Sequence, residues 1–136
     1  MGYRLREHTA DVAVEATGDD LGETFAAAAD GMAAAMCEAV PGSGDRFPVS
    51  VAAESREALL FDYLDELIYQ RDVRAVLPVD NEATVEQCER EWVLEGTARG
   101  VPLADVSARE VKAVTYSEMD LSETDGGWRA YVVLDV

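Results

Sequence analysis

The chain has 136 residues, enough to bury one hydrophobic core, so we expect a single domain over residues 1–136. Its formal net charge of −17, from 28 acidic against 11 basic residues, disfavours direct binding to nucleic-acid phosphates. No apolar run approaches the length of a membrane-spanning helix, and residues 1–6 lack the basic start and apolar run of a secretion signal.

The acidic residues are scattered along the chain, and Lys112 is the only lysine. Hydrated carboxylates spread over a whole surface suit a salt-rich cytoplasm, where salt screens their mutual repulsion. We therefore interpret the charge as a halophilic adaptation of a cytoplasmic protein. An acidic surface for a partner is the alternative, although such a surface would cluster its charge. Cys37 and Cys88 are far apart in sequence, as expected of free thiols in a reducing compartment.

The first part of the chain alternates strand and helix patterns. Residues 11–16 alternate apolar and polar side chains, which predicts a half-buried strand. Asp20, with Glu23 three residues later, resembles a capping box and starts a predicted helix through the alanine-rich residues 21–36. After a loop rich in Pro, Gly and Ser, the alternation at residues 47–51 predicts a second strand.

The clearest element is a helix at residues 55–72. Its apolar side chains recur with a period near 3.6, at Leu59, Leu60, Tyr63, Leu64, Leu67 and Ile68. Ser55 is a suitable N-cap, because its hydroxyl can accept from free N–H groups of the first turn. Asp62, Asp65 and Glu66 lie off the apolar stripe, on a face that we expect to meet water. We predict that this helix is the spine of the core.

The rest of the chain shows strand patterns. They occur at residues 74–79, 84–98, 111–116, 119–121 and 128–136. Pro78 places the first of them at an edge or an end of a sheet. Asp125-Gly126-Gly127 predicts a hairpin turn, because glycine adopts positive φ at no steric cost. This order predicts an α+β domain in which two helices pack on a mixed, mostly antiparallel β-sheet.

The residue types restrict the possible chemistry. The chain has no GxGxxG, P-loop, GxSxG or HExxH motif, and His8 is the only histidine. A histidine-based metal cluster and a conventional catalytic triad are therefore excluded within one chain. Carboxylates remain, and they favour ions with oxygen ligands, such as Mg²⁺ or Ca²⁺. Asp11 and Asp135 open and close strands, where Asp is depleted, although a solvated surface role is the simpler interpretation of each.

Four blocks of the sequence together resemble the archease family. HTADVAVEA at residues 8–16 resembles its N-terminal signature, and LLFDYLDELIY at 59–69 is similar to its central helix. EVKAVTY at 110–116 and the closing WRAYVVLDV at 128–136 resemble its two C-terminal strands. The blocks stand in the family's order and span nearly the whole chain.

This resemblance implies a function that the residue patterns alone do not reach. Archeases are small proteins that assist the GTP-dependent RNA ligase of the RtcB type in tRNA splicing. They promote formation of the ligase–guanylate intermediate and allow multiple turnover, without being the ligase themselves. The resemblance thus implies a non-catalytic accessory protein whose partner is an RtcB-type ligase and whose association with tRNA and GTP is indirect.

The resemblance also implies a site for a divalent metal ion, Ca²⁺ or Mg²⁺/Mn²⁺. The family binds this ion through an Asp of the HTAD motif and an Asp near the C-terminus. The matching residues here are Asp11 and Asp135, with Val136 as a further oxygen donor. The two aspartates would meet if their strands lay side by side. The same resemblance places four more residues near the ion or facing the ligase: His8, Asp62, Lys112 and Tyr116.

Two positions depart from the family pattern. Ser117 stands where the family often has His, and Tyr63 replaces a Trp of the central helix motif. Two functions of other classes also remain open. One is a metal-dependent hydrolase acting alone, for which the aspartates have no evident general base beside them except His8. The other is a chaperone-like binding module, which would expose an apolar patch and would not depend on Asp11.

Overall fold

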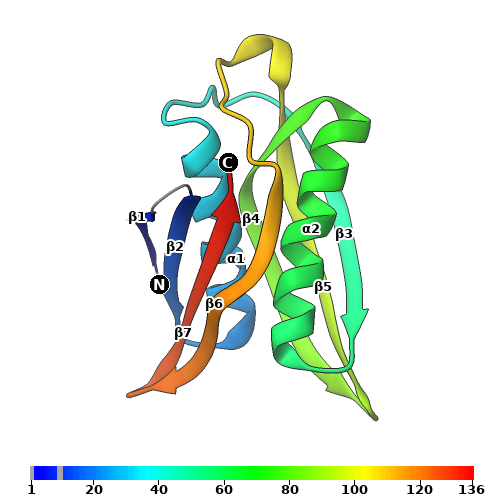
Figure 1. Ribbon diagram of the computed structural model, residues 1–136. Coiled ribbons are helices and arrows are strands. Elements are labelled where there is room, and N and C mark those ends of the chain that lie inside the picture. Colours follow the sequence, from blue (N-terminus) through cyan, green and yellow to red (C-terminus); the bar gives the residue numbers. More distant parts are fainter. Residues whose placement is uncertain (1, 9–10) are drawn as a thin grey trace.

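In the computed structural model, which describes residues 2–8 and 11–136 and only the backbone of 6–8, two helices pack against two β-sheets (Figure 1). The four-stranded sheet has the order β1 (Gly2–His8), β2 (Asp11–Gly18), β7 (Gly127–Asp135), β6 (Ala113–Thr124). The three-stranded sheet has the order β3 (Asp45–Ala53), β5 (Glu91–Pro102), β4 (Val76–Cys88). The helices are α1 (Leu21–Met36) and α2 (Arg56–Arg74), and a short 3₁₀ turn spans Leu103–Asp105.

Both helices begin at the residues that the sequence predicts. The Glu23 amide donates to Asp20 Oδ1 (2.8 Å) at the start of α1, and the Glu23 side chain accepts from the Asp19 amide (2.8 Å). This reciprocal pair is a capping box whose second bond is displaced by one residue. Ser55 caps α2 by accepting from the Ala58 amide at 3.0 Å. The predicted caps are therefore confirmed.

The core lies where the helices meet the sheets. Helix α1 contacts β1, β2 and β7 on one side and β4 on the other, and most of its residues are buried. Its small side chains let both sheets approach, and a side chain at Gly22 would collide with the Ala83 carbonyl of β4. Helix α2 buries its predicted apolar stripe against the three-stranded sheet and β6 and exposes the opposite face.

The α+β class is confirmed, and each neighbouring pair of strands among the described residues is antiparallel. Strand β4 is an edge strand, as Pro78 predicts. The predicted hairpin turn at Asp125-Gly126 is also present, with Gly126 at φ 87°. No helix in the described part of the chain is long and apolar enough to cross a membrane.

Three features of the strands differ from the sequence analysis. Strand β1 was not predicted. It lies at a sheet edge and leaves Tyr3 and Leu5 exposed, so buried apolar side chains among its described residues do not mark it as a strand. The single strand predicted at 84–98 is a hairpin of β4 and β5, in which Glu89 takes a positive φ of 59° without any glycine to mark the turn. The strands predicted at 111–116 and 119–121 belong to one strand, β6, interrupted by a bulge.

Candidate functional site

Asp11 and Asp135 lie opposite one another at one end of the four-stranded sheet. Strands β2 and β7 are antiparallel neighbours, and the register pairs Asp11 with Asp135. Directly opposite residues of such strands project from the same face with their Cβ atoms about 4.5–5.5 Å apart. The two aspartates that the resemblance singles out are thus side by side, although their residue numbers differ by 124.

The aspartates share the outer face of the sheet, away from the helices. Their strand neighbours Val12 and Leu134 pack toward the core, so the alternation of a strand turns Asp11 and Asp135 outward. Asp11 is half-buried, Asp135 is exposed, and the exposed Val136 that follows adds a main-chain oxygen. In Figure 1 this end of the sheet lies where β2 begins and β7 ends, beside the point marked C.

Helix α2 braces this end of the sheet through Arg71, which the sequence analysis did not single out. The Lys112 amide donates to the Asp135 carbonyl at 2.7 Å. The Arg71 Nη1 atom donates to the carbonyl of the preceding Val111 at 2.9 Å, and Arg71 is only 8% exposed. Its position on the apolar stripe of α2, three residues after Ile68, was the available signal. Arg71 therefore fixes the backbone that holds the end of β7.

Among the described residues, the donors near Asp11 and Asp135 are oxygen atoms. Within the described residues, no three His, Cys, Asp or Glu side chains are grouped so as to hold a metal ion. His8 pairs with Asp11 in the β1–β2 register, but its side chain lies outside the described residues, as does the whole of Thr9. Two carboxylates with a main-chain oxygen suit a hard divalent cation that completes its shell with water or a partner's oxygens. The residues present fit such an ion.

Asp62 and Tyr116 form a separate surface at the seam between α2 and β6. The Tyr116 ring stacks on Phe61 with centroids 4.2 Å apart and planes 7° from parallel. Ala113, not Tyr116, pairs with Asp135, so Tyr116 lies on the order of 10 Å further along β6. Desolvation and then the charge of Asp62 raise the pKa of Tyr116, so its hydroxyl stays protonated further into the alkaline range. The structure therefore divides the predicted residues between two places.

A further polar cluster, absent from the sequence analysis, joins α1 to a bulge of β4. Asp30 Oδ1 accepts from the Asn81 amide at 3.0 Å and from Asn81 Nδ2 at 2.9 Å. Burial, the largest effect, raises the pKa of Asp30. Burial and the charge of Asp30 also raise the pKa of Tyr63, whose hydroxyl has no hydrogen-bond partner among the described residues. This cluster lies in the interior, where α1 meets the edge strand.

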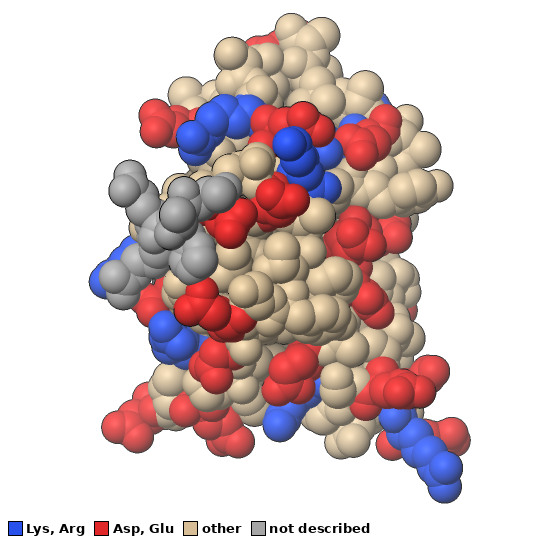
Figure 2. All heavy atoms as spheres, viewed as in Figure 1, with Lys and Arg blue, Asp and Glu red and all other residues tan. Residues whose placement is uncertain are grey.

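Charge is distributed over the surface as the sequence predicts. Figure 2 shows acidic side chains scattered around the viewed face, with basic ones interspersed among them. Several arginines are already paired with carboxylates, as in Arg129 with Glu15 and Arg99 with Asp80. The acidic excess therefore remains largely unneutralised, and no basic stripe is present on this face for a phosphate backbone.

Comparison with known proteins gives consistent matches over nearly the whole chain. Residues 3–136 match the model of the Archease protein family. The chain is 32% identical to the protein archease of Pyrococcus furiosus, covering 96% of this chain and 95% of that one. It is 34% identical to the protein archease of Methanosarcina mazei, covering 98% of this chain and 95% of that one.

Two solved structures share the fold. The solution structure of Methanobacterium thermoautotrophicum protein 1598 matches with a TM-score of 0.85 and 32% identity, over 99% of each chain. The crystal structure of an archease from Thermotoga maritima, named a possible chaperone, matches with a TM-score of 0.64 over 98% of this chain and 96% of that one. At 19% identity the second match supports the fold alone.

Proposed function

This chain belongs to the archease family, and from that premise we propose that it is a non-catalytic activator of a GTP-dependent RNA ligase of the RtcB type. It acts in the cytoplasm during tRNA splicing, where it promotes guanylylation of the ligase and allows multiple turnover. The ligase binds the tRNA and the GTP. The acidic surface of this chain supports the assignment of RNA binding to the ligase, because it repels nucleic-acid phosphates.

The observation that carries the proposal is the register of Asp11 against Asp135 on an exposed sheet end. These two carboxylates and the main-chain oxygen of Val136 would hold a divalent ion, Ca²⁺, Mg²⁺ or Mn²⁺. Such an ion supplies positive charge, which stabilises phosphate oxygens. The exposure of Asp135 leaves the site open to a partner.

The chain's own residues keep this end of the sheet in place before a partner arrives. The Lys112 amide and Arg71 restrain the backbone at the end of β7. A backbone that is already held in place loses less conformational entropy when a partner docks on it. The side chain of Lys112, which is exposed, is in a position to meet an anionic group of the partner complex.

The way in which exposed apolar residues are mixed with carboxylates favours a specific partner over a general chaperone function. A chaperone-like module would present a contiguous apolar patch. On the outer face of α2, the exposed Tyr69 and Val73 instead alternate with Asp62, Asp65 and Asp72. Such a mixed surface is typical of a defined protein–protein interface.

Multiple-turnover RNA ligation by the cognate ligase, with and without this protein, tests the proposal. We expect wild type to restore turnover and Asp11→Asn to fail, because the neutral amide weakens the ion site. Asp125→Asn is the matched control, since it removes one charge at the other end of the β6–β7 hairpin and an Asn-Gly turn is well tolerated there.

Equal turnover with and without wild-type protein would refute the activator function. Metal-dependent hydrolysis of phosphoesters by this chain alone, lost in Asp11→Asn, would then favour the hydrolase alternative. Activation that survives in Asp11→Asn would refute the role of the ion while leaving the partner in place.

A further inference from the structure

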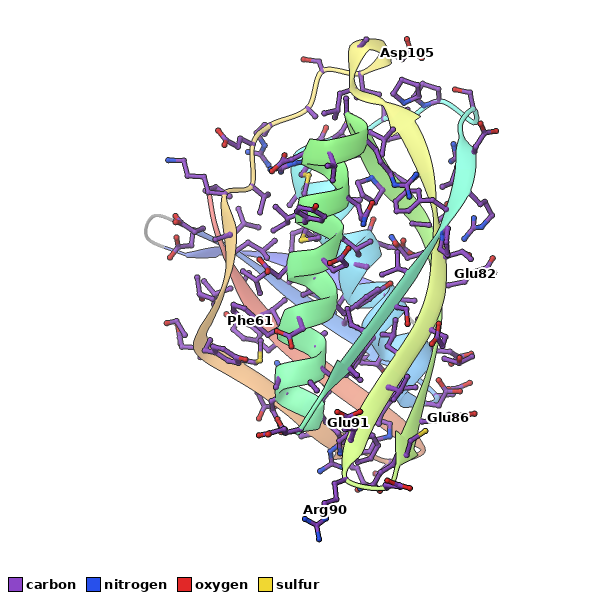
Figure 3. All side chains as sticks on the ribbon, turned by 90° about the vertical axis from the view of Figure 1, so that its right-hand side faces the viewer. Phe61, Glu82, Glu86, Arg90, Glu91 and Asp105 are labelled. Atoms are coloured by element: carbon purple, nitrogen blue, oxygen red, sulfur yellow. The ribbon has the colours of Figure 1, made fainter. Side chains whose placement is uncertain are left out.

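The outer face of α2 is an exposed surface without a cover from the rest of the described chain. Tyr69 and Val73, one helical turn apart, are 58% and 60% exposed. Asp62 and Asp65 lie on the same face, which Figure 3 turns toward the reader. These two large apolar side chains lie on the polar face of an amphipathic helix and take no part in the buried stripe. This face therefore calls for an explanation beyond the core.

Strand β6, at its bulge, extends this face with a second aromatic element. Residues 116–119 of β6 lie opposite the single residue Val132 of β7, and Glu118 takes a positive φ of 56°. Tyr116 follows the core residue Val114 by two positions, so the alternation of the strand directs it to the side of the sheet that faces α2. There its ring stacks on Phe61, which projects from the side of α2 that faces β6 (Figure 3). Tyr116 remains 56% exposed. The bulge follows directly, and bulges are over-represented at sheet edges and beside functional sites.

The arginines of α2 are all turned away from this face. Arg56 lies over the rings of Trp92 and Trp128, and Arg74 lies over the ring of Phe47. Arg71 is buried against the Val111 carbonyl. Asp62 and Asp65 have no ion pair within the described residues. The face therefore combines aromatic contact area with uncompensated negative charge.

We propose that Phe61, Asp62, Asp65, Tyr69, Val73 and Tyr116 form a docking surface for a cationic protein surface with apolar side chains beside its basic ones. Nucleic acids and anionic membranes carry the wrong charge for this face. A second copy of the chain, also at −17, would place aspartates against aspartates. The inference rests on the proposed function in one respect, because it assigns the cationic surface to the RNA ligase.

Aromatic residues and charge would act differently in this surface. Central aromatic side chains contribute most of the affinity of an interface, whereas exposed charges mainly raise the association rate and its dependence on salt. Tyr69 and Tyr116 thus provide the contact, and Asp62 and Asp65 select the partner. The ion site at Asp11 and Asp135 lies apart from this surface, at the end of the four-stranded sheet.

The first experiment measures the affinity of purified cognate ligase for this protein in buffered KCl. We expect Asp65→Lys combined with Tyr69→Ala to weaken binding at least tenfold, because both residues are exposed and the fold does not need them. The matched control combines Glu86→Lys with Val40→Ala, one charge reversal and one apolar truncation at exposed positions off α2. It should bind within about twofold of wild type.

The second experiment does not need the ligase. A designed 18-residue helical peptide of Lys and Leu is titrated into ¹⁵N-labelled protein, and amide shift changes are mapped. Changes concentrated at Asp62, Asp65, Tyr69 and Tyr116 support the surface. Changes spread over acidic residues of both sheets overturn it.

The two experiments separate the inference from the proposed function. If the ligase is bound and activated by the double variant as by wild type, the docking surface is overturned and the activator function stands. If wild type neither binds nor activates the ligase, the activator function fails. The peptide map then decides whether the surface itself stands.

Discussion

Replacing Arg71 with Met tests how α2 supports the end of the sheet. Met keeps an apolar stem of similar length in the core, so the change removes mainly the guanidinium. That group donates to the Val111 carbonyl at 2.9 Å and pairs with Asp72 at 3.0 Å. The two interactions differ in burial, because Val111 is fully buried whereas the Asp72 side chain is 65% exposed.

The burial difference decides which interaction dominates. A hydrogen bond from a charged donor to a buried carbonyl contributes about 1.5–3 kcal/mol, and its loss leaves that carbonyl unpaired. A solvent-exposed ion pair contributes about 0–1 kcal/mol. Removing a buried charge recovers part of its desolvation penalty. We therefore expect Arg71→Met to lower the free energy of unfolding by about 2 kcal/mol and Asp72→Asn by less than about 1 kcal/mol.

Urea unfolding of wild type, Arg71→Met and Asp72→Asn measures both values. The Arg71→Met loss should persist in about 2 M KCl, because salt screens exposed pairs far more than buried ones. Hydrogen exchange of the Lys112 amide should also accelerate, since its bond to the Asp135 carbonyl loses support. An Asp72→Asn loss as large as that of Arg71→Met, or a loss abolished by salt, would refute the reasoning.

Three more outcomes follow from charge and burial. Because the net charge of −17 repels itself, raising KCl from about 0.1 M to about 2 M should raise the thermal midpoint followed by circular dichroism. A midpoint that falls would contradict the halophilic interpretation. Burial raises the pKa of Asp30, so the folded state binds this proton more tightly, and the group's contribution to stability falls as pH rises from its ordinary pKa through the raised one. Asp30→Asn keeps an acceptor for Asn81 and cannot ionise, so its free energy of unfolding relative to wild type should increase with pH over that acid range in urea titrations; a decrease would have the wrong sign. Arg56→Ala removes a guanidinium 5.5 Å from the Trp92 ring centroid and 5.0 Å from that of Trp128. It should lower stability by about 0.5–1 kcal/mol for each ring and shift to the red the emission of the chain's only two tryptophans, whereas unchanged emission would argue against that contact.

Helices were predictable because their signals are local. Asp20 and Ser55 start α1 and α2 as the caps indicate, and the apolar spacing of 55–72 identified the buried face. The closing hairpin at Asp125-Gly126 was equally readable, because its glycine marks the turn.

Features that depend on distant partners were not predictable. Strand β1 is held by its pairing with β2 at a sheet edge, and its own sequence does not show that pairing. Glu89 and Glu118 take positive φ, which their side chains do not favour, so the β4–β5 turn and the β6 bulge carry no sequence mark. The surrounding strand ladders impose those conformations.

The candidate site, too, was predictable in part from the sequence and in part only from the fold. Composition pointed to oxygen ligands, and the family resemblance selected Asp11 and Asp135. Their pairing required the order β1-β2-β7-β6, which brings the first part of the chain beside its last strand. The separation of Tyr116 from that pair depended on the register of β6 against β7, and its stack on Phe61 depended on the docking of α2.

The most direct test of the ion site is a Mn²⁺ titration followed by electron paramagnetic resonance, with the protein free of other divalent ions. We expect one tightly bound Mn²⁺ in wild type and in Asp125→Asn, and loss of that ion in both Asp11→Asn and Asp135→Asn. Circular dichroism of all four proteins would show that the fold is kept. Unchanged Mn²⁺ binding in either Asp11→Asn or Asp135→Asn would contradict the paired-carboxylate site.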